Sequence, residues 1–97
     1  MKFAIILAPE AVEDRKRLKA SAWAAVRDAL ETNLRHEPTK TSRSRVKRLR
    51  GLTRPQFRLR VGGIRVFYDV AGSTVEVLAI IAKSEAGSWL AQFADPE

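Results

Sequence analysis

Three arginines lie around a pair of glycines in the second half of the chain: Arg58 and Arg60 precede Gly62-Gly63, and Arg65 follows. Apolar residues alternate with these arginines on both sides, which predicts a β-hairpin with a two-residue turn. In that hairpin Arg60 lies opposite Arg65, and like charges in such a pair destabilise a sheet. Because guanidinium groups clamp phosphate oxygens in pairs, we interpret the cluster as a phosphate site.

The two-residue turn also fixes a register that sorts the faces of the sheet. The apolar face is expected to be covered by helices and comprises Phe57, Leu59, Val61, Ile64, Val66, Tyr68, Val75, Val77, Ala79 and Ile81. The three arginines fall on the opposite face, together with Asp69 and Glu76. Two interpretations therefore stand: the arginines pair with those carboxylates, or they bind phosphate. The grouping of three arginines favours phosphate.

The basic residues of the chain are concentrated in one segment. Between Glu37 and Asp69 there are ten Lys or Arg and no Asp or Glu, within a total net charge of +7. Surface charge normally mixes both signs, so this segment predicts a polyanionic partner, with nucleic acid favoured over a merely solvated face. The further RNA-binding residues that we predict are Lys47, Arg48, Arg50 and Arg54.

Composition excludes several classes of protein. The 97 residues predict a single domain over 1–97. The chain has no cysteine and one histidine, His36, so we expect neither disulfide nor metal site nor cofactor. The longest apolar runs are six residues, Phe3 to Ala8 and Val77 to Ala82, whereas a membrane span needs about 20. We therefore expect a cytoplasmic protein without membrane contact.

The remaining elements follow from periodicity and from helix breakers. Lys2 to Leu7 is typical of a strand, and Pro9 to Lys19 of a short helix with acids first and bases last. A second helix closes by about Arg35, before Pro38, and its apolar stripe is Trp23, Val26, Leu30 and Leu34. Thr39 to Ser44 reads as an exposed loop. After the hairpin, Thr74 to Lys83 predicts a third strand, and Glu85 to Phe93 a last helix.

The stretch Arg48-Leu49-Arg50-Gly51, followed by Phe57 to Tyr68 (FRLRVGGIRVFY), resembles the central signature of the RelE/ParE toxin superfamily. The order of elements is similar over essentially the whole chain. The resemblance implies an α+β fold: an antiparallel sheet of about four strands with two N-terminal helices packed on one face. It also implies the toxin of a type II toxin–antitoxin system, a ribosome-dependent mRNA endoribonuclease. Such a toxin is restrained by a cognate antitoxin from the same operon, in a toxin–antitoxin hetero-oligomer.

The resemblance also assigns residues. Arg58, Arg60 and Arg65 match the family's catalytic basic positions, and Lys83 is the one candidate for the basic residue at the last strand's end, although it falls on the core parity. Where many relatives use a C-terminal tyrosine, this chain has Trp89, which either stacks on a base or seals the core. Tyr68, the sole tyrosine, reads as core. No general base is evident; Glu76 and Glu85 remain as proton acceptors.

Three further apolar residues, Phe67, Leu78 and Ile80, are assigned by parity to the arginine face, where we expect them to contact the C-terminal tail or an antitoxin. Two other functions remain open. A ParE-like toxin shares the architecture but poisons DNA gyrase and lacks nuclease residues, and the missing tyrosine favours it. A non-catalytic basic RNA-binding module would leave transcripts intact.

Overall fold

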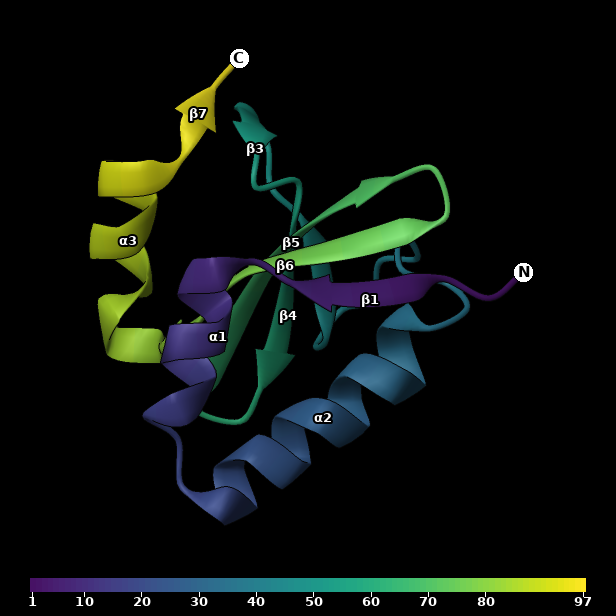
Figure 1. The fold of residues 1–97 in the computed structure, drawn as a ribbon. Helices are drawn as coiled ribbons and strands as arrows, with labels where there is room; N and C mark the ends of the chain where they lie inside the picture. Colours follow the sequence, from purple (N-terminus) through teal and green to yellow (C-terminus); the bar gives the residue numbers. More distant parts are fainter.

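In the computed structural model, which describes residues 1–97, the chain forms a five-stranded sheet with helices on both sides (Figure 1). The strand order is β1-β6-β5-β4-β2, and β1 runs parallel to β6 while all other neighbours are antiparallel. The bounds of the elements, in chain order, are β1 Ala4–Leu7, α1 Pro9–Lys16, α2 Ala20–Leu34, β2 Val46–Arg48, β3 Leu52–Arg54, β4 Phe57–Val61, β5 Ile64–Ala71, β6 Thr74–Ala82, η1 Lys83–Glu85, α3 Ala86–Phe93 and β7 Asp95–Pro96.

The expected α+β architecture is confirmed, with three differences. The sheet has five strands rather than about four, because the short β2 adds to the outer edge of β4. It is mixed rather than purely antiparallel, since β1 is parallel to β6. A separate two-stranded sheet, β3 with β7, ties the C-terminus to the segment after β2. No helix is long and apolar enough to span a membrane.

The hairpin of β4 and β5 has the predicted register. Gly62 and Gly63 form the turn, and Arg60 lies opposite Arg65. Gly62 has φ +57°, a conformation that glycine adopts without steric cost and that hairpin turns demand at their first central position. The alternation of apolar residues therefore places all three arginines on one side of the sheet.

The main core lies between the sheet and the two N-terminal helices. Ala11 of α1 and the predicted stripe of α2, with Val26, Leu30 and Leu34, pack there against the apolar face of the sheet. Trp23 is half-buried against the same core. Tyr68 is fully buried, stacks on Phe57 and donates its hydroxyl hydrogen to the carbonyl oxygen of Pro38 at 2.7 Å. The prediction that Tyr68 is a core residue is thus confirmed.

The predicted parity of β6 is wrong beyond Val77. A bulge leaves Leu78 without a partner, because Tyr68 lies opposite Val77 while Phe67 lies opposite Ala79. The extra residue exchanges the two faces of the strand. Ile80 therefore belongs to the main core, and not to the arginine face. Ala79 and Ile81, assigned to the core face from sequence, lie on the arginine side, opposite Phe67 and Arg65.

Helix α1 fastens the bulged end of β6. β1 ends at Leu7, opposite Val77, so the outer edge of β6 has no strand partner beyond that residue. There the backbone N–H of Ile80 donates to Oδ2 of Asp14 at 3.0 Å. A side chain of α1 thus satisfies a backbone donor that the sheet leaves open.

The C-terminal helix α3 lies on the side of the sheet opposite α2 (Figure 1). The ring of Trp89 stacks on Phe67 with centroids 5.0 Å apart and planes within 3°. Beyond α3, just after β7, the N–H of Glu97 donates to the carbonyl oxygen of Gly51 at 3.0 Å. The predicted helix over the tail is confirmed, and it covers part of the arginine side.

Candidate nucleic-acid interface

Five basic residues, four on three adjacent strands and one just before β2, form what we term the basic face. The register of the sheet puts Lys47 opposite Arg58, and Arg60 opposite Arg65. Arg45 extends the second row, because the N–H of Arg60 donates to its carbonyl oxygen at 2.8 Å. Alternation around the buried Val46 sends Arg45 and Lys47 to the same side. The sheet thus gathers two rows of cations on one surface.

Arg65 is the most rigidly held member of the basic face. Its side chain is buried, with 7% of the residue exposed. Nη1 donates to the carbonyl oxygens of Gly62 at 2.8 Å and Ile64 at 3.1 Å. These bonds use one nitrogen of the guanidinium and fix its plane beside the turn. A preorganised cation of this kind loses little entropy when it binds an anion.

Arg58 is held in an unfavourable environment. Its Nε is the one buried side-chain nitrogen or oxygen of the chain that lacks a hydrogen-bond partner. Burial lowers the pKa of its guanidinium, and the positive charges of Arg65 and Arg60 lower that pKa further. Such a shift means that the fold disfavours the charged form. An anion bound between these side chains would offset the cost of desolvation by its attraction and would also reduce the repulsion among the arginines.

The three arginines of the hairpin have no carboxylate partner, so the ion-pair interpretation of their grouping is wrong. The two acids on that side of the sheet serve Arg54 instead: its Nε lies 3.7 Å from Asp69 Oδ2, and its Nη2 lies 3.3 Å from Glu76 Oε1. Asp69 also accepts the N–H of Gln56 at 2.7 Å. Burial nevertheless raises the pKa of the Asp69 carboxyl.

The other residues predicted to bind RNA are not all on the basic face. Lys47 belongs to it. Arg48 turns to the opposite side, over the ring of Phe57 at 5.3 Å, and donates to the carbonyl oxygen of Gln56 at 2.8 Å. Arg50 is exposed beside the turn at Gly51, and Arg54 is occupied by its two carboxylates. Sequence reasoning missed Arg45, which the alternation Arg45-Val46-Lys47 could have revealed.

The structure separates the three apolar residues that parity had grouped. Phe67 is buried under Trp89, with 1% of the residue exposed. Trp89 therefore seals this side of the sheet, as one of its two interpretations held. Ile80 faces the main core. Leu78 lines a groove of about 550 Å³ between α1 and α3.

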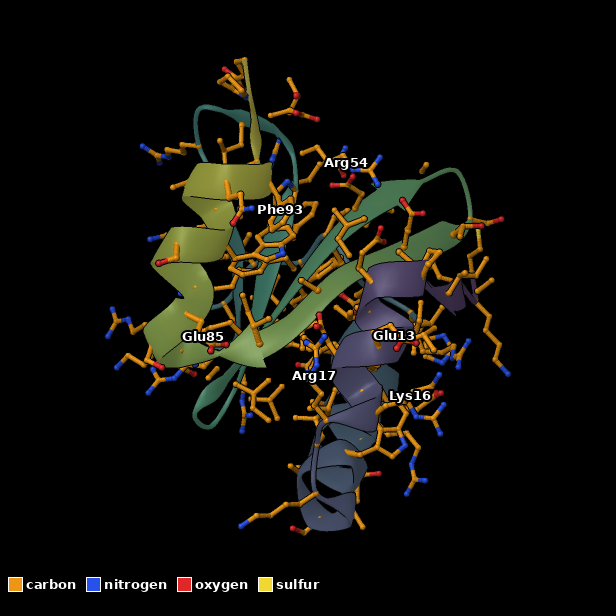
Figure 2. All side chains as sticks on the ribbon, turned by 60° about the vertical axis from the view of Figure 1, so that its left-hand side comes forward. Glu13, Lys16, Arg17, Arg54, Glu85 and Phe93 are labelled. Atoms are coloured by element: carbon orange, nitrogen blue, oxygen red, sulfur yellow. The ribbon has the colours of Figure 1, made fainter.

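That groove borders the basic face, because its lining residue Ile81 lies opposite Arg65. Ile81, Trp89 and Phe93 add apolar lining to Leu78, and Phe93 is 56% exposed. The remaining lining is charged and comprises Glu10, Glu13, Asp14, Arg17 and Arg54. Figure 2 shows Glu13 and Arg17 on α1 at one wall and Phe93 on α3 at the other, with β6 running between them.

Lys83 begins η1, directly after β6. Its N–H donates to the carbonyl oxygen of Gly63 at 2.8 Å, which sets it beside the hairpin turn. Because of the bulge, Ala79 and Ile81 lie on the arginine side, and continued alternation places Lys83 on that side as well. The parity of the sequence alone assigns Lys83 to the core side. The exposed Lys83 thus lies at the margin of the basic face.

Groups suited to proton transfer are scarce here. The hydroxyl of Tyr68 lies in the core on the other face, and burial raises its pKa, so it stays protonated. Glu76 is paired with Arg54. Glu85 is exposed and makes no ion pair or side-chain hydrogen bond within the chain. The arrangement can therefore bind a phosphate and stabilise negative charge, which is electrostatic rather than acid–base chemistry.

These observations define a class of protein: a small α+β domain with a cationic sheet face beside a C-terminal helix. The model of the family described as "ParE toxin of type II toxin-antitoxin system, parDE" matches residues 5–87. The chain therefore belongs to the ParE toxin family and is the toxin of a type II toxin–antitoxin system. No curated protein sequence gives a significant match.

Solved structures agree on the fold. A chain of the toxin–antitoxin complex RelBE2 from Mycobacterium tuberculosis is 25% identical with a TM-score of 0.68, over 84% of this chain and 99% of that one. In the RelB–RelE complex from Methanococcus jannaschii the values are 17% and 0.68, over 87% and 96%. In the RelE–RelB complex from Pyrococcus horikoshii they are 22% and 0.64, over 86% and 97%.

Proposed function

We propose that this toxin cleaves mRNA on the ribosome and that the basic face holds the scissile phosphate. The observation that carries the proposal is the convergence of Arg58, Arg60 and Arg65 on one side of the sheet without a carboxylate partner. Placing like charges together costs stability. A bound phosphodiester supplies the compensating charge, and guanidinium forks match its oxygens.

The reaction is an in-line attack within the RNA strand. The 2′-hydroxyl loses its proton, and its oxygen bonds to the adjacent phosphorus. The bond from phosphorus to the 5′-oxygen of the next nucleotide breaks, and that oxygen takes up a proton. The products are a cyclic phosphate and a 5′-hydroxyl. Negative charge gathers on the phosphoryl oxygens in the transition state, which cations around them stabilise.

The arginines divide this work by their surroundings. Arg65, fixed to the turn carbonyls, is the anchor that orients the phosphate. Arg58, half-buried with an unpaired Nε, gains most when charge develops, because low polarity strengthens its attraction. Arg60 and Lys83 are exposed, and their charges steer RNA to the site. Positioning and charge stabilisation carry the catalysis, and the ribosome supplies the alignment of the message.

One specific observation favours a second candidate, inhibition of DNA gyrase. The matching family model describes ParE toxins, and the basic face offers no group with the character of a general base. A gyrase inhibitor would use the same cations to bind a protein or DNA surface, with no strand cleavage. The two functions predict different products in cells: cut transcripts in one case, and altered supercoiling in the other.

We also propose a cognate antitoxin as the partner of this chain. The three similar structures are complexes of a toxin with an antitoxin. The groove between α1 and α3 offers Leu78, Trp89 and Phe93 as an apolar docking strip, next to the basic face. An antitoxin segment with apolar residues for the groove and acids for the basic face would mask both at once.

The test is inducible expression of the toxin with and without the neighbouring antitoxin gene, followed by primer extension on a translated message. We expect growth arrest and new 5′ ends in the wild type, and neither in Arg65→Ala nor in the double variant Arg58→Ala with Arg60→Ala. Arg27→Ala is the matched control, because Arg27 is an exposed arginine of α2, on the other side of the sheet.

Full toxicity of a folded Arg65→Ala toxin would rule the proposal out. Growth arrest with intact transcripts and inhibited supercoiling by gyrase would establish the second candidate instead. RNA binding without either effect would identify a non-catalytic RNA-binding module.

A further inference from the structure

We propose a second phosphate subsite beside the hairpin turn, in a hollow of about 310 Å³ lined by Ser44, Arg45, Arg60 and Gly62. It binds the phosphodiester next to the scissile one on the same RNA strand. The inference rests on the proposed function, since it extends the path of the RNA from the three hairpin arginines toward β2. None of the lining residues is apolar, so the hollow suits a charged ligand.

The position of Arg45 follows from the sheet. The bond from the N–H of Arg60 to its carbonyl oxygen, 2.8 Å long, continues the pairing of β2 with β4 one residue beyond Val46. Arg45, Arg60 and Arg65 therefore form one row across three segments. Neighbouring strands lie about 4.8 Å apart, so the backbones of the two outer arginines are about 10 Å apart. Arg60 stands between them and serves both phosphates.

The backbone around Arg45 is held in place by hydrogen bonds to Ser42. The hydroxyl oxygen of Ser42 accepts the N–H of Arg45 at 3.0 Å and that of Val46 at 3.1 Å. The N–H of Ser42 in turn donates to the carbonyl oxygen of Val46 at 2.9 Å. These bonds turn the end of the loop into a compact unit anchored on a buried valine. A site on such a support loses little entropy on binding.

The hollow contains hydrogen-bond donors that the protein leaves without acceptors. The guanidinium groups of Arg45 and Arg60 make no ion pair or hydrogen bond within the chain, and the hydroxyl of Ser44 makes none either. The N–H of Gly62 has no acceptor in the protein, whereas its carbonyl oxygen accepts Nη1 of Arg65. Two guanidinium forks, a hydroxyl and a backbone N–H are a donor set suited to phosphate oxygens.

A phosphate of a second RNA, such as ribosomal RNA, would present the same chemistry. Arg60 favours the same strand, because it borders both the hollow and the row that holds the scissile phosphate. One strand passing over Arg60 contacts both subsites without a change of direction. A phosphate from another strand would have to approach within one nucleotide spacing of the first, against electrostatic repulsion.

The experiment measures binding of a short oligoribonucleotide made resistant to cleavage by 2′-deoxyribose at the scissile nucleotide. In a set of such probes, each phosphate in turn is replaced by an uncharged methylphosphonate. We expect Arg45→Ala to weaken binding about 10-fold, as loss of a charge-assisted contact does. The slope of log affinity against log salt should fall by about 0.7. Arg27→Ala, which removes the same charge from the other side of the sheet, should leave that slope unchanged.

The methylphosphonate series locates the phosphate. One substitution, next to the scissile position, should weaken the wild type but not Arg45→Ala, because that variant has already lost the contact. If every substitution costs Arg45→Ala as much as it costs the wild type, the phosphate comes from another strand and the inference is overturned. It is overturned equally if Arg45→Ala binds as the wild type does.

The proposed function fails separately. If Arg58→Ala weakens binding while Arg45→Ala does not, the second subsite is wrong and the scissile-phosphate site stands. If the wild type binds none of the probes, both proposals fall. Circular dichroism of Arg45→Ala checks its fold, which we expect to be intact because Arg45 is exposed and its backbone bonds do not depend on its side chain.

Discussion

On the face of the five-stranded sheet covered by α1 and α2, which we call the helix-covered face, buried polar groups have hydrogen-bond partners. The hydroxyl of Tyr68, for example, donates to the carbonyl oxygen of Pro38. On the basic face, the same strands carry cations without carboxylates, and Arg58 Nε is buried without a partner. Residues one position apart, such as Leu59 and Arg60, belong to these two different environments. The basic face therefore contributes less to the stability of the fold than the face covered by α1 and α2. This contrast between satisfied polar groups on one face and unpaired cations on the other supports the proposed phosphate site.

The largest effect expected is on the helix-covered face. Leu59 is fully buried at the centre of β4, so Leu59→Ala should lower the free energy of unfolding by about 2–5 kcal/mol. Arg60→Ala, one residue along, should change it by less than about 0.5 kcal/mol. Urea unfolding of the two variants measures the difference. Equal losses would show that the two faces contribute alike to stability.

Asp14 tests the fastening of β6 by α1. Asp14→Ala removes the acceptor of the Ile80 N–H and leaves a part-buried donor unpaired, which should cost about 1–3 kcal/mol of unfolding free energy. Glu13→Ala is the control, because Glu13 pairs with Lys16 in an exposed position. This variant should lose at most about 0.5 kcal/mol of unfolding free energy. Hydrogen exchange of the Ile80 amide should accelerate in Asp14→Ala alone. Slow exchange of this amide in Asp14→Ala would show that Asp14 does not hold the edge of β6.

Tyr68→Phe sharpens the account of the core. It removes the donor to Pro38 and should cost about 1 kcal/mol. Because burial raises the pKa of the Tyr68 hydroxyl in the folded state, the unfolded chain ionises first as pH rises. The contribution of Tyr68 to wild-type stability should therefore be constant below about pH 10 and fall above it. Tyr68 is the sole tyrosine, so stability should fall less at alkaline pH in Tyr68→Phe than in the wild type. An identical dependence of stability on alkaline pH in the two proteins would contradict this prediction.

The smallest stability effect has the opposite sign. Arg58→Met keeps an unbranched apolar stem and removes a cation that burial and two neighbouring arginines disfavour. We expect the unfolding free energy to rise by about 0.2–1 kcal/mol, the size of a cross-strand pair effect. Thermal unfolding at low salt measures it. A clear loss of stability would mean that Arg58 is a structural residue, and the contrast between the faces would lose its meaning.

Local signals predicted the hairpin and the helices. The two glycines, with strict alternation on either side, allow only one register of the hairpin. The structure shows that register. The stripe of α2 and the aromatic residues of α3 were equally readable. In β6 the run from Val77 to Ala82 is uniformly apolar. It holds no period that could reveal the bulge at Leu78, and so the sequence predicts the wrong faces for Ala79, Ile80 and Ile81.

The short strands depend on tertiary partners rather than on their own sequence. β2 has three residues and β7 two, one of them proline; neither has a propensity that stands out from the loops around it. β2 bears on the proposed function, because its pairing with β4 brings Lys47, and Arg45 just before it, to the basic face. The carboxylates of Asp69 and Glu76 were expected near the arginines, but their pairing with Arg54 requires a loop geometry that the sequence does not encode locally.

The most direct test compares stability and cleavage in the same preparation of Arg58→Met. Purified wild-type and variant toxins are added to a translating extract, and the 5′ ends of the message are mapped by primer extension. If the basic face gives up stability to hold a phosphate, the variant is at least as stable as the wild type and cleaves at least about 100-fold more slowly. Wild-type cleavage by a stably folded Arg58→Met toxin would contradict the account.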